Sequence, residues 1–327
     1  MLRPLKSKAK DYLKQRGFYQ DLLREKEALE ETKRNLEEAI EVNRHLTDYN
    51  WFAKPGHFYS PLIDEKEQDF SHLVDLWNPT NAKQVDLPGI ELRTQEQLDL
   101  LKQLAVNSDE LDDYLKNGTV RFRTDNDQFG HSDRSFLYLM LRHFKPKRVI
   151  EVGSGWSSAL MLDVNEKYPK QTADLTFVEP YPERLYSAIK PKDKKHCTII
   201  TEKVQSVDIA KFTKLKEGDI LFIDNSHVSK TGSDVNFLFF EVLPRLKKGV
   251  IIHIHDVFYP FEYPVQWVVE DKRNWNEAYA LRGLLTGTNM FEIIMWPSYL
   301  LTKDTKNVQK QIPAAKDFGS SIWLRKS

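Results

Sequence analysis

The stretch Arg148-Val149-Ile150-Glu151-Val152-Gly153-Ser154-Gly155-Trp156-Ser157-Ser158 decides the fold of this chain. Its apolar start predicts a short buried strand over 149–152 that breaks into a glycine turn and opens a helix. Glycines let the backbone approach a ligand closely, and a helix N-terminus presents free N–H groups. Glu151 would repel a pyrophosphate, and Ser158 stands where a dinucleotide site has its third glycine. Both departures argue against a dinucleotide site.

Four further apolar runs follow this turn, and each ends close to a polar side chain. They predict strands over residues 175–180, 198–200, 219–224 and 249–256, with helical stretches between them. Alternating strands and helices predict an α/β fold with a doubly wound parallel sheet, whose ligands bind beyond the carboxyl ends of the strands. The acids that fall near those ends are Glu151, Glu179, Asp224 and Asp256. That edge of the sheet is the expected ligand site.

The glycine turn and the ordered strand-end acids resemble the class I S-adenosylmethionine-dependent methyltransferases over residues 120–327. The resemblance implies a Rossmann-like, seven-stranded, mostly parallel sheet that ends in an antiparallel hairpin, with strands over 291–295 and 321–324. It implies that S-adenosylmethionine lies over the glycine turn, with Glu179 on its ribose hydroxyls and the loop after the third strand at its adenine. The cofactor-binding residues that follow from it are Glu151, Gly153, Ser154, Gly155, Ser157, Ser158, Glu179, Pro180, Val204, Gln205 and Asp224.

The segments 222–227 and 249–256 resemble small-molecule O-methyltransferases of the catechol and macrolide-sugar types, many of which use magnesium. The resemblance implies methyl transfer to an oxygen of a small molecule or a sugar. Catechol-type enzymes place Asp-Asn after the fifth strand, where this chain has His255-Asp256.

Two carboxylates, Asp224 and Asp256, end strands that are neighbours in this fold. Such a pair suits a hard divalent cation, here Mg²⁺, and a metal-bound hydroxyl loses its proton more easily. Either His227 or His255 can serve as a base beside them, so Asp224, His227 and His255 are the candidate catalytic residues. His253 shares a strand face with His255 and is expected to pack under a helix.

Three other functions stay open at this point. One is N-methylation, for which a metal is unnecessary. Another is an NAD-dependent enzyme, which Glu151 and the missing third glycine disfavour. The last is a non-catalytic module that serves assembly, which the strand-end acids disfavour.

Composition narrows the expected partners. The 327 residues contain 48 Lys and Arg against 48 Asp and Glu, so the formal net charge is zero and nucleic acid is not an expected partner. No apolar run approaches the roughly 20 residues that span a bilayer, and the basic N-terminus shows no apolar signal segment. One cysteine, Cys197, excludes an intrachain disulfide and fits a reducing compartment. We therefore expect a cytoplasmic protein.

The chain is expected to have three parts. Residues 1–50 predict a long charged helix with one apolar stripe, which forms either a weak coiled coil in a homo-oligomer or a surface helix on its own domain. The residues of the stripe are Leu22, Leu29, Leu36 and Ile40. Residues 51–119 are rich in proline and aromatic residues and are expected to pack on the catalytic domain, which spans 120–327.

Local signals predict the remaining elements. Leucines at helical spacing predict a helix over 94–106, and another is expected over 276–285. Ser132 is expected to cap a helix that Pro146 ends. The aromatic loop after the fifth strand is expected to wall the acceptor pocket. Its candidate substrate-contacting residues are Phe258, Tyr259, Phe261 and Tyr263.

Overall fold

The computed structural model describes residues 24–41, 52–64, 69–82, 85–118, 121–126 and 128–327. The chain divides into two compact units, residues 1–67 and residues 68–327. Each unit is described by itself. In the described residues, no helix has the length and apolarity that crossing a membrane requires.

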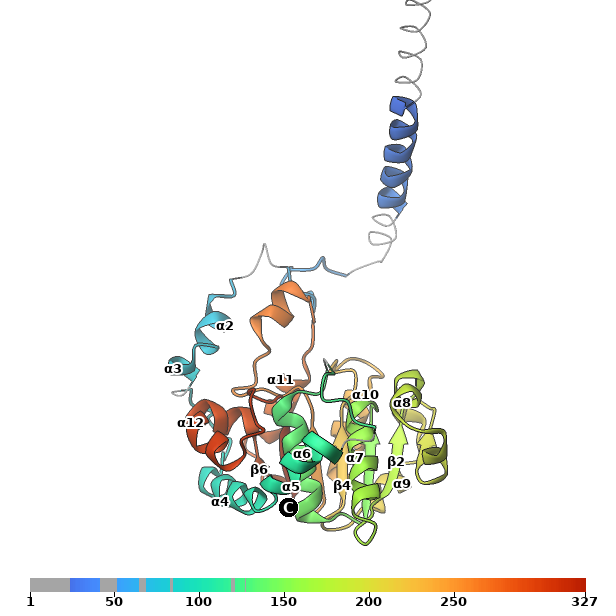
Figure 1. Cartoon of the computed structure of the whole chain (residues 1–327). Coiled ribbons are helices and arrows are strands. Elements are labelled where there is room, and N and C mark those ends of the chain that lie inside the picture. The colour runs from blue at the N-terminus through green and yellow to red at the C-terminus, as the bar shows by residue number, and fades with distance from the viewer. Residues whose placement is uncertain (1–23, 42–51, 65–68, 83–84, 119–120, 127) are drawn as a thin grey trace, which may run out of the picture. The chain divides into compact units, whose positions relative to one another are not determined.

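A seven-stranded sheet forms the centre of the larger unit, and its strand order is β3-β2-β1-β4-β5-β7-β6 (Figure 1). The strands are β1 Arg148–Val152, β2 Asp174–Val178, β3 Thr198–Ile200, β4 Ile220–Ile223, β5 Ile251–Ile254, β6 Phe291–Met295 and β7 Ile322–Lys326. The first five strands are parallel, and β7 runs antiparallel to both of its neighbours. The predicted mostly parallel, Rossmann-like methyltransferase sheet with its final hairpin is confirmed.

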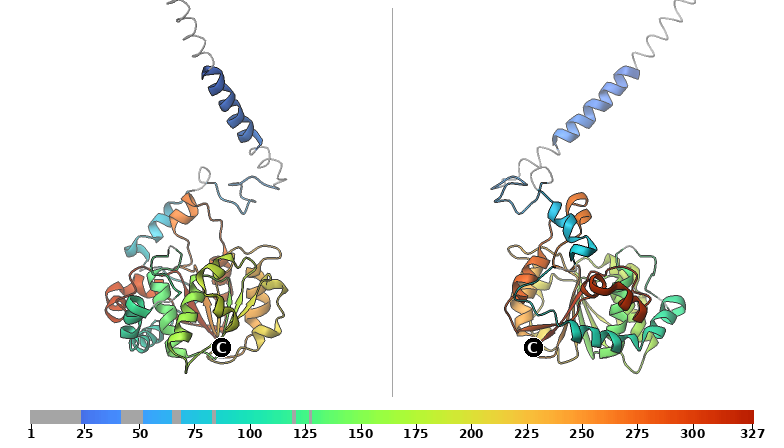
Figure 2. Two further views of the ribbon diagram at one scale, coloured as in Figure 1. Left: turned by 45° about the vertical axis from the view of Figure 1, so that its right-hand side comes forward. Right: turned by 90° about the vertical axis from the view of Figure 1, so that its left-hand side faces the viewer.

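Helices cover both faces of this sheet (Figure 2). The α-helices are α2 Ser71–Leu76, α3 Pro79–Ala82, α4 Thr94–Ala105, α5 Ser108–Asp113, α6 His131–Phe144, α7 Trp156–Lys167, α8 Glu183–Ala188, α9 Ala210–Thr213, α10 Asp234–Phe237, α11 Glu277–Leu285 and α12 Pro297–Gln311. Shorter 3-10 or π-helical turns are η1 Tyr114–Gly118, η2 Pro191–Lys195, η3 Val204–Ser206, η4 Leu238–Val242, η5 Leu243–Arg245 and η6 Gln266–Glu270. The helices predicted over 94–106 and 276–285 are present, each with one end shifted by one residue.

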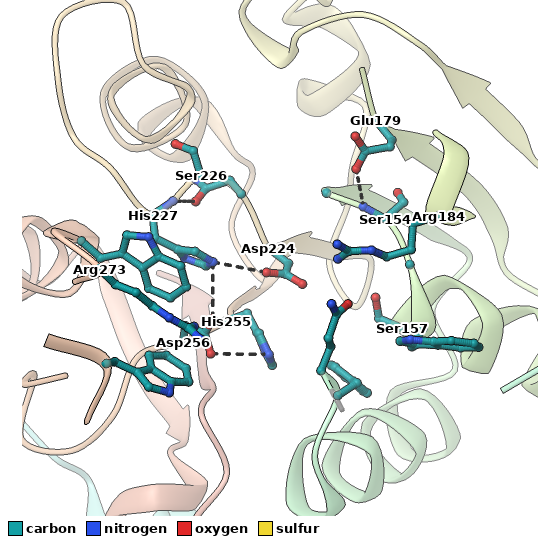
Figure 3. Close-up of a pocket in the computed structure, with 18 residues that line it drawn as sticks. Ser154, Ser157, Glu179, Arg184, Asp224, Ser226, His227, His255, Asp256 and Arg273 are labelled. Atoms are coloured by element: carbon teal, nitrogen blue, oxygen red, sulfur yellow. Dashed lines mark hydrogen bonds and ion pairs between the residues drawn. The ribbon is translucent and has the colours of Figure 1, made fainter. Parts of the chain in front are cut away.

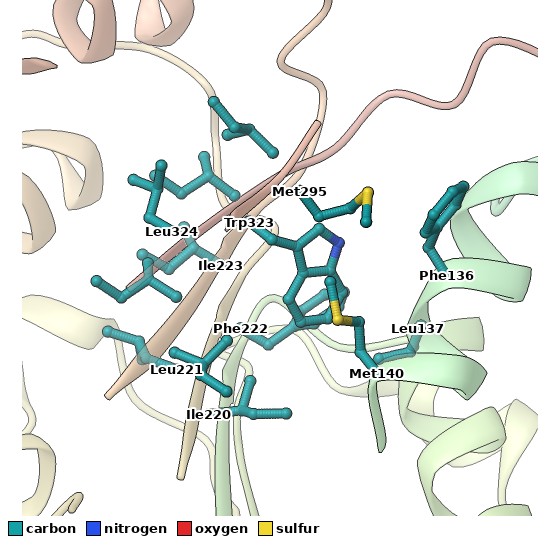
Figure 4. Close-up of a cluster of buried hydrophobic side chains, with 14 of the residues drawn as sticks. Phe136, Leu137, Met140, Ile220, Leu221, Phe222, Ile223, Met295, Trp323 and Leu324 are labelled. Atoms are coloured by element: carbon teal, nitrogen blue, oxygen red, sulfur yellow. The ribbon is translucent and has the colours of Figure 1, made fainter. Parts of the chain in front are cut away.

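The core lies between the central strands and α6. Phe222 and Trp323 point toward Met140 of α6, while Leu221 points to the opposite face of the sheet (Figure 4). His253 lies in this layer, because its ring stacks on Phe222 at 3.8 Å and meets Trp323 edge-on at 4.5 Å. Burial lowers the pKa of His253 well below its ordinary value, so the ring stays neutral. His253 therefore packs in the core, as the sequence predicts.

The start of α6 differs from its prediction. Ser132 does not cap the helix, because its hydroxyl donates to the carbonyl of Asp317. The carboxylate of Asp317 instead accepts the N–H groups of His131 at 2.6 Å and Ser132 at 2.8 Å. A carboxylate here also favours the positive end of the helix dipole. The cap comes from a residue far along the chain, which local sequence cannot reveal.

Residues 24–41 of the smaller unit form one helix. Three members of its predicted stripe, Leu29, Leu36 and Ile40, are 71%, 59% and 57% exposed. The fourth, Leu22, lies outside the described residues. Ion pairs from Lys26 to Glu30 and from Lys33 to Glu37 support the helix at one-turn spacing. Self-association through this stripe stays a prediction.

The described residues from 69 to 118 belong to the larger unit. The indole of Trp77 lies edge-on to Phe258 at 5.5 Å and donates to the carbonyl of Tyr263 at 3.1 Å. Helix α4 packs against β6, α6 and α12. The contacts thus divide the chain between residues 67 and 68, within the expected segment 51–119.

Arg121 connects the segment before α6 to α7 and to η2. Its guanidinium is buried and donates to Asp163 at 2.9 Å, to Asp193 at 2.7 Å and to Glu166 at 2.5 Å. Asp163 also accepts the hydroxyl of Tyr114. Because Asp163 and Asp193 are buried, the guanidinium that contacts both of them stabilises their charges.

Replacing Arg121 with Ala should destabilise the protein by about 3–5 kcal/mol, because two buried carboxylates lose the guanidinium that they share. Urea unfolding monitored by fluorescence measures the change. Arg123→Ala is the matched control, since Arg123 pairs with Asp125 on the surface and should shift stability by no more than about 1 kcal/mol. Equal losses in the two variants would contradict the role of Arg121.

Candidate active site

The turn after β1 lies directly against the end of β4. Gly153 has a φ of +81°, and a Cβ atom there would stand 1.6 Å from the backbone oxygen of Asp224. Backbone bonds fix this approach, since Gly153 donates to Val178 at 3.0 Å and Asp224 donates to Val152 at 2.8 Å. Only glycine fits at position 153.

Glu151 lies beneath this turn and lines neither of the cavities described below. One carboxylate oxygen accepts the hydroxyl of Ser157 at 2.5 Å, and the other accepts the hydroxyl of Ser158. Ser158 in turn accepts the N–H of Gly155 at 3.1 Å. Glu151 and Ser158, which the sequence places at the cofactor, thus shape the turn from below, whereas Ser157 also lines the cavity.

Two cavities open at the carboxyl ends of the strands, and Figure 3 shows the residues that line the larger one. One has a volume of about 530 Å³ and the other of about 450 Å³. The residues that border both are Gly153, Glu179, Asp224, Asn225 and Ser226. Asp224 therefore stands where the two cavities meet.

The smaller cavity holds the residues expected at the ribose and adenine. Glu179, Pro180, Val204 and Gln205 all line it. The Glu179 carboxylate accepts the N–H of Ser154 at 3.0 Å, which ties β2 to the glycine turn. The Gln205 amide donates to the carbonyl of Gly232 at 2.8 Å and so joins the loops on the two sides of the cavity.

A cluster of carboxylates and imidazoles forms the floor of the larger cavity. His227 Nε2 lies 3.4 Å from a carboxylate oxygen of Asp224 and 3.4 Å from one of Asp256. One donor atom from each of these three residues lies within 4.8 Å of the others, close enough to hold one metal ion. The Nδ1 atom of His227 meets the buried carboxylate of Glu277 at 2.8 Å. Sequence reasoning missed Glu277.

The charges in this cluster shift one another's pKa values. Burial alone would lower the pKa of His227, but hydrogen bonds to Asp224 and Glu277 raise it well above its ordinary value. Burial pulls the pKa of Asp224 upward, but the charges of His255 and His227 outweigh it and hold that pKa below its usual range. Burial raises the pKa of Asp256 and of Glu277. Three carboxylates surround one imidazole, so the cluster has excess negative charge when all three carboxylates are ionised.

His255 lies beside this cluster and also lines the larger cavity. Its Nε2 atom is 3.7 Å from Asp256 and 3.3 Å from the hydroxyl of Ser320, which donates to the buried carboxylate of Asp133 at 2.9 Å. The ring stacks on Phe129 at 5.3 Å. The charges of Asp256 and Asp224 outweigh burial and raise the pKa of His255. Both histidines that the sequence singles out as bases therefore face the same cavity.

The expected aromatic wall is formed by other residues. Phe258, Tyr259, Phe261 and Tyr263 are buried, and none of them lines the cavity. Tyr259 and Tyr263 use their hydroxyls on the backbone of Val85 and Ala278. The residues that wall this side are Trp267, Arg273 and Trp275, farther along the same loop. The run of charged and indole side chains over 267–275, just before a predicted helix, was the available signal for them.

Glu151 gives the stability of the protein a specific dependence on pH. Burial raises the pKa of Glu151 to about 8 from an ordinary 4.5, so the folded state holds its proton more tightly than the unfolded chain. The resulting stabilisation is complete below pH 4.5 and is lost as the pH rises through about 8, by at most about 1.4 kcal/mol per pH unit. Glu151→Gln should remove this slope, and thermal unfolding of native and variant protein across the window measures it. Parallel curves would contradict the assignment.

Comparisons with known proteins agree with this geometry. The model of the methyltransferase domain family matches residues 150–257. An uncharacterized protein of Archaeoglobus fulgidus is 30% identical over 184 residues, which cover 54% of this chain and 81% of that protein. The residues that the family model matches include the glycine turn after β1.

Several solved structures are similar in fold to this chain, at low sequence identity. A Podospora anserina methyltransferase, PaMTH1, bound to S-adenosylhomocysteine has 16% identity, a TM-score of 0.40, and a match over 71% of this chain and 88% of its own. A putative O-methyltransferase from Klebsiella pneumoniae has 13% identity, a TM-score of 0.39, and a match over 69% and 89%. The O-methyltransferase TomG from Streptomyces achromogenes has 14% identity, a TM-score of 0.37, and a match over 69% and 89%.

The matching family model, the strand order and the glycine turn at the end of β1 lead to one assignment. The chain belongs to the class I S-adenosylmethionine-dependent methyltransferases.

Proposed function

We propose that this protein transfers the methyl group of S-adenosylmethionine to an oxygen of a small molecule or sugar, with a divalent cation bound beside the acceptor. The observation that carries this proposal is the cluster of Asp224, His227 and Asp256 on the floor of the larger cavity, where Asp224 also borders the smaller one. Methyl transfer itself needs mainly alignment, because the sulfonium is already a strong electrophile. An alcohol acceptor needs in addition the removal of its proton.

The cofactor fits across the two cavities. The adenosine occupies the smaller one, where the Glu179 carboxylate accepts the ribose hydroxyls beside Val204 and Gln205. The methionine part lies over Ser154 and Gly155 in the larger cavity. The remaining space of the larger cavity, beside Asp224, would then receive the acceptor. Asp224 borders both cavities and can contact both reactants.

The donor set fits a divalent cation. Two carboxylates and one imidazole offer three ligand atoms. With a cation bound, Glu277 would accept the Nδ1 proton of His227 and leave the Nε2 lone pair for the cation. A cation offsets the excess negative charge of this buried cluster. Bound there, it lowers the pKa of a hydroxyl that it coordinates. An oxygen-rich set with one imidazole accepts Mg²⁺ and also Mn²⁺.

His255 is the proposed base. With His227 engaged by the carboxylates, His255 is the other imidazole in the larger cavity. Its Nε2 atom contacts the Ser320 hydroxyl, and that hydroxyl donates a hydrogen bond to Asp133. A proton accepted by the ring would therefore be stabilised by a nearby carboxylate. His255 thus takes the role that the sequence left open between two histidines.

Replacing Glu179 with Gln should weaken the binding of S-adenosylhomocysteine about tenfold or more, because a charge-assisted bond to the ribose is worth about 1.5–3 kcal/mol. Calorimetry with the purified protein measures this affinity. Glu183→Gln is the control, because Glu183 is exposed and lines neither cavity. Unchanged affinity in Glu179→Gln would remove Glu179 from the ribose.

Metal removal tests the cation. The native protein should bind one Mn²⁺ per chain, and electron paramagnetic resonance should show this binding lost in Asp256→Asn and kept in the exposed control Asp208→Asn. Methylation of an acceptor should stop with a chelator and return with Mg²⁺, because the hydroxyl keeps its proton without the cation. Turnover that ignores the chelator, together with no Mn²⁺ binding, would favour metal-free transfer to nitrogen instead.

A further inference from the structure

A wall of one arginine and two indoles bounds the acceptor side of the larger cavity. It belongs to residues 264–276, which connect β5 to α11 and include η6. The guanidinium of Arg273 lies 4.1 Å from the ring centre of Trp267 and 4.9 Å from that of Trp275. The two indoles meet edge-on at 5.4 Å. Figure 3 shows Arg273 on the same side as His227 and Asp256, with Arg184 across the cavity.

This wall is held in place from behind. The N–H of Arg273 donates to the carbonyl of Trp267 at 2.9 Å. The Trp267 ring packs on Phe258 at 5.2 Å, and the Trp275 ring packs on His227 at 4.3 Å. The buried aromatic residues before the wall therefore support it, and Trp275 connects it to the metal-binding cluster. A guanidinium fixed between two rings has lost much of its rotamer freedom before a ligand binds.

Arg273 keeps hydrogen-bonding capacity for a ligand. Its Nε and Nη2 atoms both contact the same oxygen of Asp271, at 3.1 Å and 2.9 Å. Both side chains of this pair are about a third exposed, so their attraction is screened by water. Within the described part of the chain, no residue is recorded as a partner of Nη1. A carboxylate or phosphate can bind there in place of water.

The second arginine of the cavity has a different position. Arg184 flanks the glycine turn, because its Cδ atom would lie 3.2 Å from a Cβ at Gly155. In the proposed function the methionine part of the cofactor lies over that turn. Its carboxylate would therefore pair with Arg184. Arg273 lies on the opposite, acceptor side. The cavity therefore offers one cation for the cofactor and one for the acceptor.

We propose that the acceptor is an anionic hydroxylated ring, whose carboxylate or phosphate binds Arg273 while its hydroxyl reaches Asp224 and Asp256. The inference rests on the proposed function and names its substrate class. The ring lies against Trp267 or Trp275, because indoles stack well on flat or sugar rings. The anion must stay away from the carboxylates on the floor, and binding to the wall separates these like charges. A neutral ring would bring no anion to the Nη1 atom of Arg273.

The test compares matched anionic and neutral probes by calorimetry on the full chain saturated with S-adenosylhomocysteine. The pairs are 3,4-dihydroxybenzoate with catechol, glucuronate with glucose, and glucose 6-phosphate with glucose. In at least one pair the anion should bind roughly tenfold or more tightly, the usual strength of a charge-assisted bond. The pair that responds distinguishes a carboxylate from a phosphate and a phenol from a sugar.

Variants of Arg273 and Asp271 test whether this wall causes the tighter binding of the anionic probe. Arg273→Gln should abolish it while leaving the affinity for S-adenosylhomocysteine unchanged, and Arg245→Gln, which breaks an exposed pair with Glu241, should leave both unchanged. Asp271→Asn should strengthen anion binding, because it removes the competing carboxylate, and it keeps the test open if Arg273→Gln fails to fold.

Different measurements would contradict the anionic acceptor and the proposed methyl transfer. The inference is overturned if no pair shows an anion preference, if the preference survives in Arg273→Gln, or if Asp271→Asn leaves anion binding the same or weaker. If the native protein does not bind S-adenosylhomocysteine at all, the proposed function fails first and takes the inference with it.

Discussion

The contact between Gly153 and the backbone carbonyl of Asp224 is the constraint on which the site depends. Because no side chain fits at position 153, the turn after β1 can lie directly on the end of β4. The glycine turn and the acidic floor then meet at Asp224, which belongs to the floor and borders both cavities. In the proposed function, this backbone contact would bring a cofactor above the turn close to an acceptor above the floor.

Some side chains around this contact hold others in position and do not themselves line the larger cavity. Glu151 shapes the turn from beneath, and Glu277 orients His227 from behind. His227 and Asp256 have φ angles of +58° and +54°, in a region that side chains rarely adopt. Such backbone strain concentrates at functional sites, and here it accompanies two side chains that meet over the same floor.

Much of the sheet could be predicted from sequence, because buried parallel strands are short apolar runs and their ends carry the acids. The strand over 198–200 coincides with β3, and Asp224 and Asp256 do follow neighbouring strands. Contacts between distant segments could not be predicted: Asp317 caps α6, and α11 brings Glu277 to His227. The prediction that Phe258, Tyr259, Phe261 and Tyr263 contact the substrate differs from the structure for a related reason. Hydrophobicity marks Phe258 to Tyr263 as important, but their rings are buried in the core, and the more polar arginine and indoles face the cavity.

The central claim is that the cation and the transferable methyl group share one floor at Asp224. Nuclear magnetic resonance of bound S-adenosylmethionine with a ¹³C-labelled methyl group tests it directly, with Mn²⁺ as the paramagnetic probe. Mn²⁺ should strongly broaden the methyl signal in the native protein, and Asp224→Asn combined with Asp256→Asn should abolish the broadening at the same Mn²⁺ concentration. Bound cofactor whose methyl signal Mn²⁺ leaves sharp in the native protein, or broadens equally in the double variant, would contradict the account.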